Sequence, residues 1–136
     1  FFDLAPDDAL IIDCDVPQSR YWSFHLYTLG WWEAFPDLGR VTTRNHTQTR
    51  LDGDGRARVV VAHDDPGVPN WLDAQGRREA LLTLRWFWPT GDPPSPTTRV
   101  VKLGDVRASL PADTPVVVPL RQPRRCSCCR SVSRTT

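Results

Sequence analysis

The sequence contains no methionine, no run of about eighteen apolar residues that could span a membrane as a helix, and no secretory signal-peptide pattern. It also lacks a basic stripe. Residues 1–120 carry 12 Lys and Arg against 16 Asp and Glu, whereas residues 121–136 carry five Arg and no acid. We therefore expect neither a membrane span nor nucleic-acid binding, and no feature assigns a cellular compartment. Because the chain starts at Phe1 and has no methionine, we expect it to be a fragment of a longer protein.

Cysteine is scarce outside the C-terminal end. Cys126, Cys128 and Cys129 lie together and Cys14 stands alone, which is not the even spacing of a disulfide-stapled secreted domain. The clustered cysteines lack a second ligand pair at zinc-finger spacing, so we expect no structural metal there. Residues 121–136 show no apolar periodicity and are expected to be a disordered tail rich in Arg, Ser and Cys.

Apolar residues recur at every second position in short segments, and no segment has the period of an amphipathic helix. The expected strands are residues 9–16, 20–27, 42–51, 57–63, 80–88, 98–103 and 116–118. The turn at residues 52–55 should join its neighbours as a β-hairpin. This pattern predicts an all-β fold, a jelly-roll-like antiparallel β-sandwich with long packed loops, as one domain over residues 1–120.

The connection at residues 64–76 is long and contains its own tryptophan. Two prolines and two glycines forbid a helix there, and Trp71 is expected to fix the loop to the domain body. Asn70 and Asp73 are expected to accept or donate main-chain bonds in the bends, with Gly76 closing the turn. The interpretation is a structural clamp; the alternative is a binding site, since loops often carry one.

Catalytic and metal-binding signatures are weak. His25, His46 and His63 include no His-x-His pair, so no metal or cofactor is predicted. Ser23 and His25 share a strand face, but residues two apart on a strand point in parallel, so we expect no contact between them. No catalytic residue is therefore assigned. The alternative hypothesis is a metal-dependent or hydrolytic enzyme that uses His25 and His63.

One mixed polar and aromatic row remains, formed by Tyr21, Ser23, His25 and Tyr27 on the outward face of the strand at residues 20–27. If this face is concave, its rings and hydroxyl groups suit a sugar or another small molecule. If it is flat, it suits an interface with a neighbouring domain. The sequence supports both interpretations equally.

Several motifs resemble a known bacterial family. They are RYWSFHLY at residues 20–27, WWE at 31–33, PGVPNWLD at 66–73, LRW at 84–86 and RVVKL at 99–103. In this order they are similar to the family of domain of unknown function 1214, over residues 3–110. The resemblance implies a jelly-roll sandwich with no established catalytic residues. It also implies an N-terminal β-domain in the same polypeptide, which belongs to the family of domain of unknown function 1254. We therefore expect a non-catalytic ligand-binding or interaction module that acts with an upstream domain.

Overall fold

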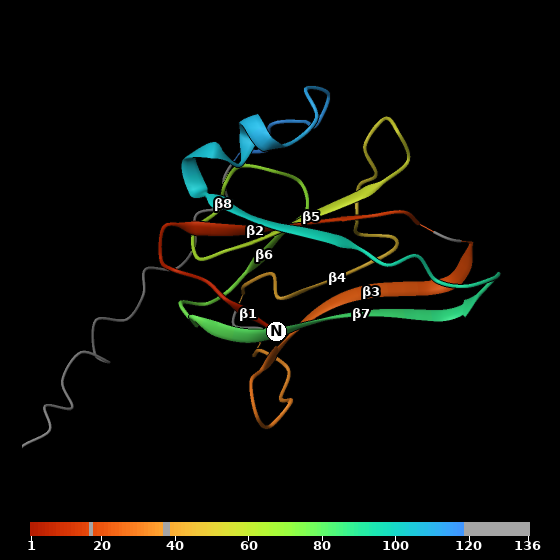
Figure 1. The fold of residues 1–136 in the computed structure, drawn as a ribbon, viewed down its shortest axis with the longest axis horizontal. Coiled ribbons are helices and arrows are strands. Elements are labelled where there is room, and N and C mark those ends of the chain that lie inside the picture. The colour runs from red at the N-terminus through yellow and green to blue at the C-terminus, as the bar shows by residue number, and fades with distance from the viewer. Residues whose placement is uncertain (17, 37–38, 119–136) are drawn as a thin grey trace, which may run out of the picture.

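The computed structural model describes residues 1–16, 18–36 and 39–118, and in this part of the chain two four-stranded sheets pack face to face without an α-helix (Figure 1). The first sheet has the order β1 (Phe2–Asp3), β7 (Glu79–Pro89), β3 (Ser19–Thr28), β4 (Thr43–Asn45). The second has the order β6 (Trp71–Asp73), β5 (Ala57–Ala62), β2 (Asp8–Cys14), β8 (Thr97–Lys102). The predicted all-β sandwich is confirmed, while its jelly-roll topology stays a prediction.

Strand β3 supplies the first sheet with its side of the core. Trp22, Phe24 and Leu26 alternate along it and are all buried between the sheets. β3 pairs antiparallel with β7 along almost the whole length of both strands, from Ser19 opposite Pro89 to Thr28 opposite Ala80. The expected alternation of this strand is therefore what the structure shows.

Strand β2 is buried on both faces, where the sequence indicated a half-buried strand. Leu10 and Ile12 face the first sheet, as expected, but Ile11 is also fully buried. The reason is a covering segment after β8, with 3-10 helices at Leu103–Asp105 and Arg107–Ser109, which lies over the outer face of the second sheet (Figure 1). Val106 and Leu110 of this segment join Ile11 in a second apolar cluster.

The expected hairpin over residues 42–63 is wrong. β4 pairs with β3 in the first sheet, whereas β5 pairs with β2 and β6 in the second. A single bridge between Leu51 and Ala57 is all that joins the two runs, so the turn at residues 52–55 carries the chain from one sheet to the other. Residues 116–118 were expected to form a strand and form none.

The long connection contains a strand that the sequence did not indicate. β6 pairs parallel with β5, with Trp71 opposite Val60 and Asp73 opposite Ala62. It is the one parallel pair among the described strands and extends the second sheet at its edge. The tail at residues 121–136 lies outside the described residues. Among the described helices, none is long and apolar enough to cross a membrane.

Candidate functional site

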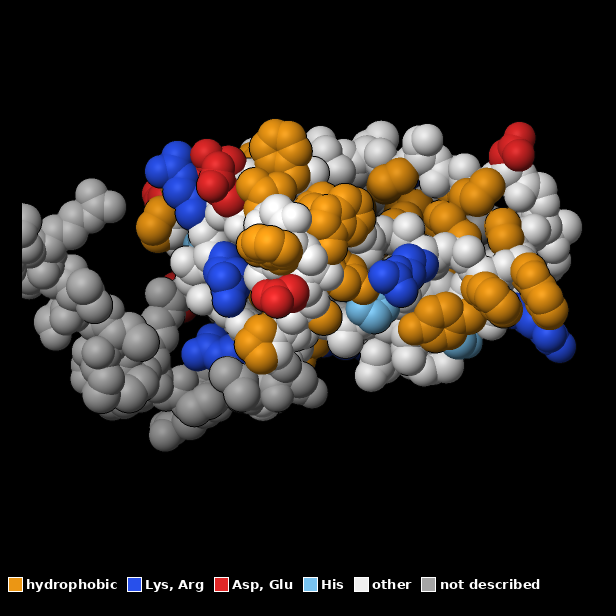
Figure 2. Space-filling model, turned by 90° about the horizontal axis from the view of Figure 1, so that it is seen from below, with side chains coloured by type: hydrophobic (Ala, Val, Ile, Leu, Met, Phe, Trp, Pro, Cys, Tyr) orange, Lys and Arg blue, Asp and Glu red, His pale blue; other side chains and the backbone are white. Residues whose placement is uncertain are grey.

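The polar and aromatic row lies on the outer face of the first sheet, as its spacing predicted. Figure 2 shows this face, where apolar side chains are spread between arginine and histidine side chains. Tyr21 is exposed, His25 and Tyr27 are partly buried, and Ser23 is completely buried beneath its neighbours. The four residues therefore share a face but not a common accessible surface.

Ser23 and His25 are in contact, which the sequence argument had excluded. Ser23 Oγ and His25 Nε2 lie 2.9 Å apart. Thr43 Oγ1 donates to the carbonyl of Phe24 and lies 3.2 Å from His25 Nδ1. Because the hydroxyl proton of Thr43 is donated to that carbonyl, Thr43 Oγ1 accepts a hydrogen bond from His25 Nδ1–H. His25 Nε2 is then unprotonated and accepts a hydrogen bond from the Ser23 hydroxyl. The expectation failed because side chains on one strand face can lean along the strand and meet.

Two neighbours set the electrostatics of this row. Burial, and to a smaller extent the charge of Arg85, lowers the pKa of His25 below its ordinary value of 6.5. Arg85 also donates to Tyr27 Oη at 2.6 Å and lies over the Tyr27 ring. The polar atoms of Ser23, His25 and Tyr27 thus bond to one another or to the neighbouring Thr43 and Arg85, which is typical of a packed surface.

The predicted loop residues make main-chain contacts between distant segments. Asn70 Nδ2 donates to the carbonyls of Arg50 and Arg58, and its Oδ1 accepts from the Arg50 amide at 2.9 Å. Trp71 Nε1 donates to the Ala62 carbonyl at 3.2 Å. These bonds tie β6 to β5 and to the chain before it, rather than closing only a local bend as expected for Asn70.

Asp73 is fully buried, and both of its oxygens are bound. Oδ1 accepts from the Gln75 amide at 2.7 Å, the turn bond that the sequence predicted, and Gly76 follows with a φ of 74°. Oδ2 accepts from Arg40 Nη1 at 2.7 Å, an ion pair that sequence spacing gave no means to predict. The structural role of Asn70, Trp71, Asp73 and Gly76 stays a prediction until their variants are measured.

The histidines do not converge. His25 lies on the outer face of the first sheet, whereas His63 follows β5 in the second and its Nε2 contacts the Leu4 carbonyl at 3.1 Å. His46 packs edge-on against Tyr21. Among the described residues, no group of three His, Cys, Asp or Glu could hold a metal ion. Burial raises the pKa of the Cys14 thiol to about 11, so this cysteine is a poor nucleophile.

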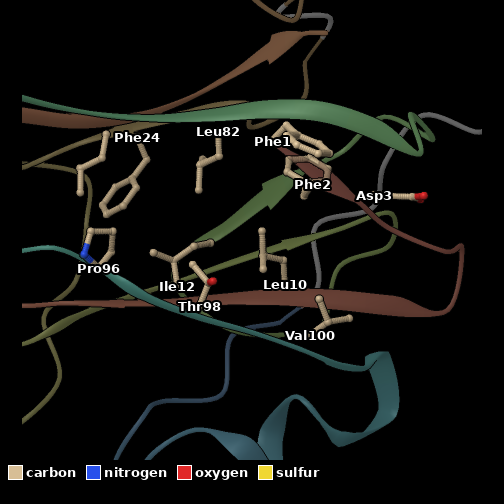
Figure 3. Close-up of a pocket in the computed structure, with 11 residues that line it drawn as sticks. Phe1, Phe2, Asp3, Leu10, Ile12, Phe24, Leu82, Pro96, Thr98 and Val100 are labelled. Atoms are coloured by element: carbon tan, nitrogen blue, oxygen red, sulfur yellow. The ribbon is translucent and has the colours of Figure 1, made fainter.

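Sequence reasoning missed an apolar cleft between the sheets, with a volume of about 440 Å³. Figure 3 shows Phe24 and Leu82 of the first sheet facing residues of β2 and β8 across it. The cleft-lining residues from strands are Phe2 and Asp3 of β1, Leu10 and Ile12 of β2, Phe24 of β3, Leu82 and Leu84 of β7, and Thr98 and Val100 of β8. Phe1 and Pro96 complete the lining.

This cleft opens at the edge where β7 and β8 lie. Leu82 and Leu84 are only partly buried, although the alternating apolar residues of the expected strand at residues 80–88 predict a face in the core, and Trp88 at the end of that strand is exposed. Val100 is 53% exposed. Alternating leucines predict burial, but they do not indicate that the described residues leave these side chains partly uncovered.

Comparison with known proteins identifies the chain at the family level. The family model described as "Protein of unknown function (DUF1214)" matches residues 5–91, more than half of the sequence. The chain belongs to the DUF1214 family. This confirms the resemblance that the motifs indicated. Comparison with curated proteins finds no match.

Solved structures support the fold of this DUF1214 chain. It is similar to an uncharacterized protein from Burkholderia cenocepacia, with 36% identity over 79% of this chain and a TM-score of 0.67. It also resembles a protein from Vibrio parahaemolyticus, with 17% identity over 74% of this chain and a TM-score of 0.62. At this identity the similarity supports the fold alone. In both cases the match covers 29% of the other chain, so the DUF1214 chain spans less than a third of these relatives.

Proposed function

We propose that this DUF1214 domain is a non-catalytic binding module, and that its binding surface is the apolar cleft between the two sheets. The observation that carries the proposal is the pair of open strand edges around an apolar volume of about 440 Å³. Exposed apolar surface of this kind usually marks a site of interaction, because leaving it in water is unfavourable. Covering the half-buried side chains of Leu82 and Leu84 would remove their remaining apolar surface from water, which is favourable.

The length of the relatives supports a role alongside other parts of a longer polypeptide. The domain corresponds to 29% of each of the two matched chains. An upstream β-domain in the same polypeptide is therefore the partner that we propose for this module. Interfaces between domains of one chain commonly combine an apolar centre with a polar rim.

The hydrolytic alternative has one observation in its favour, the 2.9 Å contact between Ser23 Oγ and His25 Nε2. A nucleophile must also reach a substrate, and Ser23 has no exposed surface. His25 lies in the first sheet and His63 follows β5 of the second, so they form no common site. The filled, internally bonded row is better suited to an interface than to a sugar pocket, and we propose it as a secondary contact surface.

Thermal-shift measurements with two apolar probes test the binding proposal. We expect laurate and the dye 1-anilinonaphthalene-8-sulfonate each to raise the melting temperature by several degrees at saturating concentration, because a ligand that binds only the folded state stabilises it. Val100→Glu should abolish the shift by placing a charge at the mouth of the cleft.

Val118→Glu is the matched control, because Val118 is 85% exposed and does not line the cleft. It should keep the shift. The proposal that the cleft binds small apolar ligands is wrong if neither probe stabilises the protein, or if Val100→Glu responds as the wild type does.

A further inference from the structure

We propose that the cleft is closed by an extended polypeptide strand that adds to the free edge of β7, antiparallel to it, in the register that β1 already sets. This inference rests on the proposed binding function and names its ligand class. The strand would come from the same longer polypeptide, on the N-terminal side of β1.

The free edge of β7 is long. On one side β7 pairs with β3 from Ala80 to Pro89, but on the other side β1 covers only Glu79 and Ala80. No other strand of the described part of the chain pairs with that second edge. A stretch of main chain beyond Ala80 therefore lies open along the mouth of the cleft.

The main-chain groups at this edge point outward. In β3, the Leu26 amide donates to the Thr42 carbonyl and the Trp22 carbonyl accepts from the His46 amide, so both residues bond away from β7. When two opposite residues of an antiparallel pair do not hydrogen-bond to each other, their amides and carbonyls point away from each other. The residues of β7 opposite Leu26, Phe24 and Trp22 thus offer unpaired amides and carbonyls to an added strand; they are Leu82, Leu84 and Trp86.

This edge also lacks the usual protection. Exposed edge strands normally carry lysine, proline or an inward charge that prevents pairing with another strand. Residues 80–88 contain neither lysine nor proline, and the one charged side chain there, Arg85, contacts Tyr27 on the outer face. The side chains of Leu82 and Leu84 face the cleft instead. An edge of this kind is suited to strand addition.

The register of β1 defines the pattern of the missing strand. Phe2 lies opposite Ala80 and Asp3 opposite Glu79, so a strand continued backward places the residue directly before Phe1 opposite Leu82. The third residue before Phe1 falls opposite Leu84, and the fifth opposite Trp86. These three positions share the inward face of Phe2, which is buried, and should therefore be apolar. The two longer relatives contain chain that could supply such a segment.

Two six-residue extensions fused directly before Phe1 test the proposal. Both alternate threonine and valine, so their composition is identical. The in-register version has valine at the first, third and fifth positions before Phe1, and the shifted version has threonine there. Both are measured by thermal melting and by amide hydrogen exchange, on samples shown to be monomeric by size-exclusion chromatography.

We expect the in-register extension to raise the melting temperature by at least several degrees over the shifted one. Exchange at the amides of Leu82, Leu84 and Trp86 should slow at least tenfold in the in-register version alone. Equal effects of the two extensions would overturn the proposal, as would the absence of any protection. Protection of the same amides in a wild-type dimer would overturn it too, because a second copy would then be the occupant.

The outcome also separates this inference from the binding proposal. If neither extension protects β7 while laurate still stabilises the protein in a Val100-dependent manner, strand addition fails and the cleft remains a binding site for small apolar ligands. If the extension protects β7 and laurate has no effect, the cleft accepts polypeptide only. That second result supports the strand proposal and rejects the small-molecule arm of the binding test.

Discussion

At the scale of single residues, two largely buried ion pairs, Asp73–Arg40 and Asp13–Arg58, connect segments that are distant in sequence. Asp73 pairs with Arg40, and Arg58 binds Asp13, Asp52 and Asp54 at distances of 2.7 to 2.9 Å. A carboxylate that loses its charge, or an arginine that loses its partner, leaves an uncompensated group in a partly desolvated place. These ion pairs therefore fix geometry, and their removal should destabilise the fold more than surface pairs would.

Asp73 gives the first prediction. Asp73→Ala removes both the bond to the Gln75 amide and the ion pair with Arg40, and should cost about 3 kcal/mol, because a fully buried carboxylate loses two charge-assisted hydrogen bonds. Asp73→Asn keeps an acceptor for the turn and should cost about 1–2 kcal/mol. Urea unfolding of both variants measures the difference. Equal losses would show that the turn bond contributes nothing.

Asp54 gives a pH prediction. The hydrogen bond from Arg58 lowers the pKa of Asp54 from 3.8 to about 2, with a smaller effect from the Arg56 amide. Since the folded value lies below the unfolded one, the stabilisation is complete above about pH 4 and is lost as the pH falls toward 2.

Urea midpoints measured at intervals between pH 5 and pH 2 test this. Asp54→Asn should reduce the fall in stability over that range. Asp92→Asn, at an exposed position in the bend after β7, is the control and should follow the wild type. A fall in the Asp54 variant as steep as in the wild type would contradict the assignment.

At the scale of elements, β6 shows what the motif at residues 66–73 builds in the central connection. Three residues form a strand that is parallel to β5, and the indole of Trp71 is buried against the second apolar cluster. A short parallel edge strand has few main-chain bonds of its own. We therefore expect its position to depend on the hydrogen bonds that the side chains of Asn70, Trp71 and Asp73 form.

Trp71→Ala should cost about 3–5 kcal/mol, the range for truncating a buried large aromatic residue. Trp31→Ala is the matched control and should change stability by less than about 0.5 kcal/mol, because Trp31 is 87% exposed. Chemical denaturation measures both. If Trp71→Ala and Asp73→Ala keep wild-type midpoints, the segment is not a structural clamp, and Asn70, Trp71 and Asp73 become the leading binding-site candidates.

At the scale of the whole molecule, the second sheet includes residues that lie beyond the family match. The match ends at residue 91, whereas β8 and the covering segment with Val106 and Leu110 follow it. These residues complete the second sheet and bury its outer face around Ile11. We propose that the domain requires them, in keeping with a single unit over residues 1–120.

Truncation tests this. A chain ending at Gly91 should lose cooperative unfolding, because Ile11, Val60 and Trp71 would be exposed to water. A chain ending at Leu120 should melt within a few degrees of the full chain, as the expected disorder of residues 121–136 requires. Circular dichroism follows both. A cooperative transition in the shorter chain would make residues 97–118 an accessory.

The candidate site was less accessible to prediction than the fold. Spacing placed Tyr21, Ser23, His25 and Tyr27 on one face correctly, because successive side chains of a strand alternate. It missed the cleft around Leu82, because a leucine facing an open edge has the same spacing as one facing a closed core. It also missed the contact between Ser23 and His25, which depends on how the two side chains lean.

The sequence by itself determined most of the longer strands, the inward faces of their apolar rows, and the all-β class, because these follow from a period of two that each segment carries locally. Tertiary structure decided which strands pair. The runs at residues 42–51 and 57–63 are adjacent in sequence yet lie in different sheets, and β6 exists only because β5 lies beside it. Pairing depends on contacts between distant segments, so only the assembled sandwich leaves the edge of β7 free beside an apolar cleft.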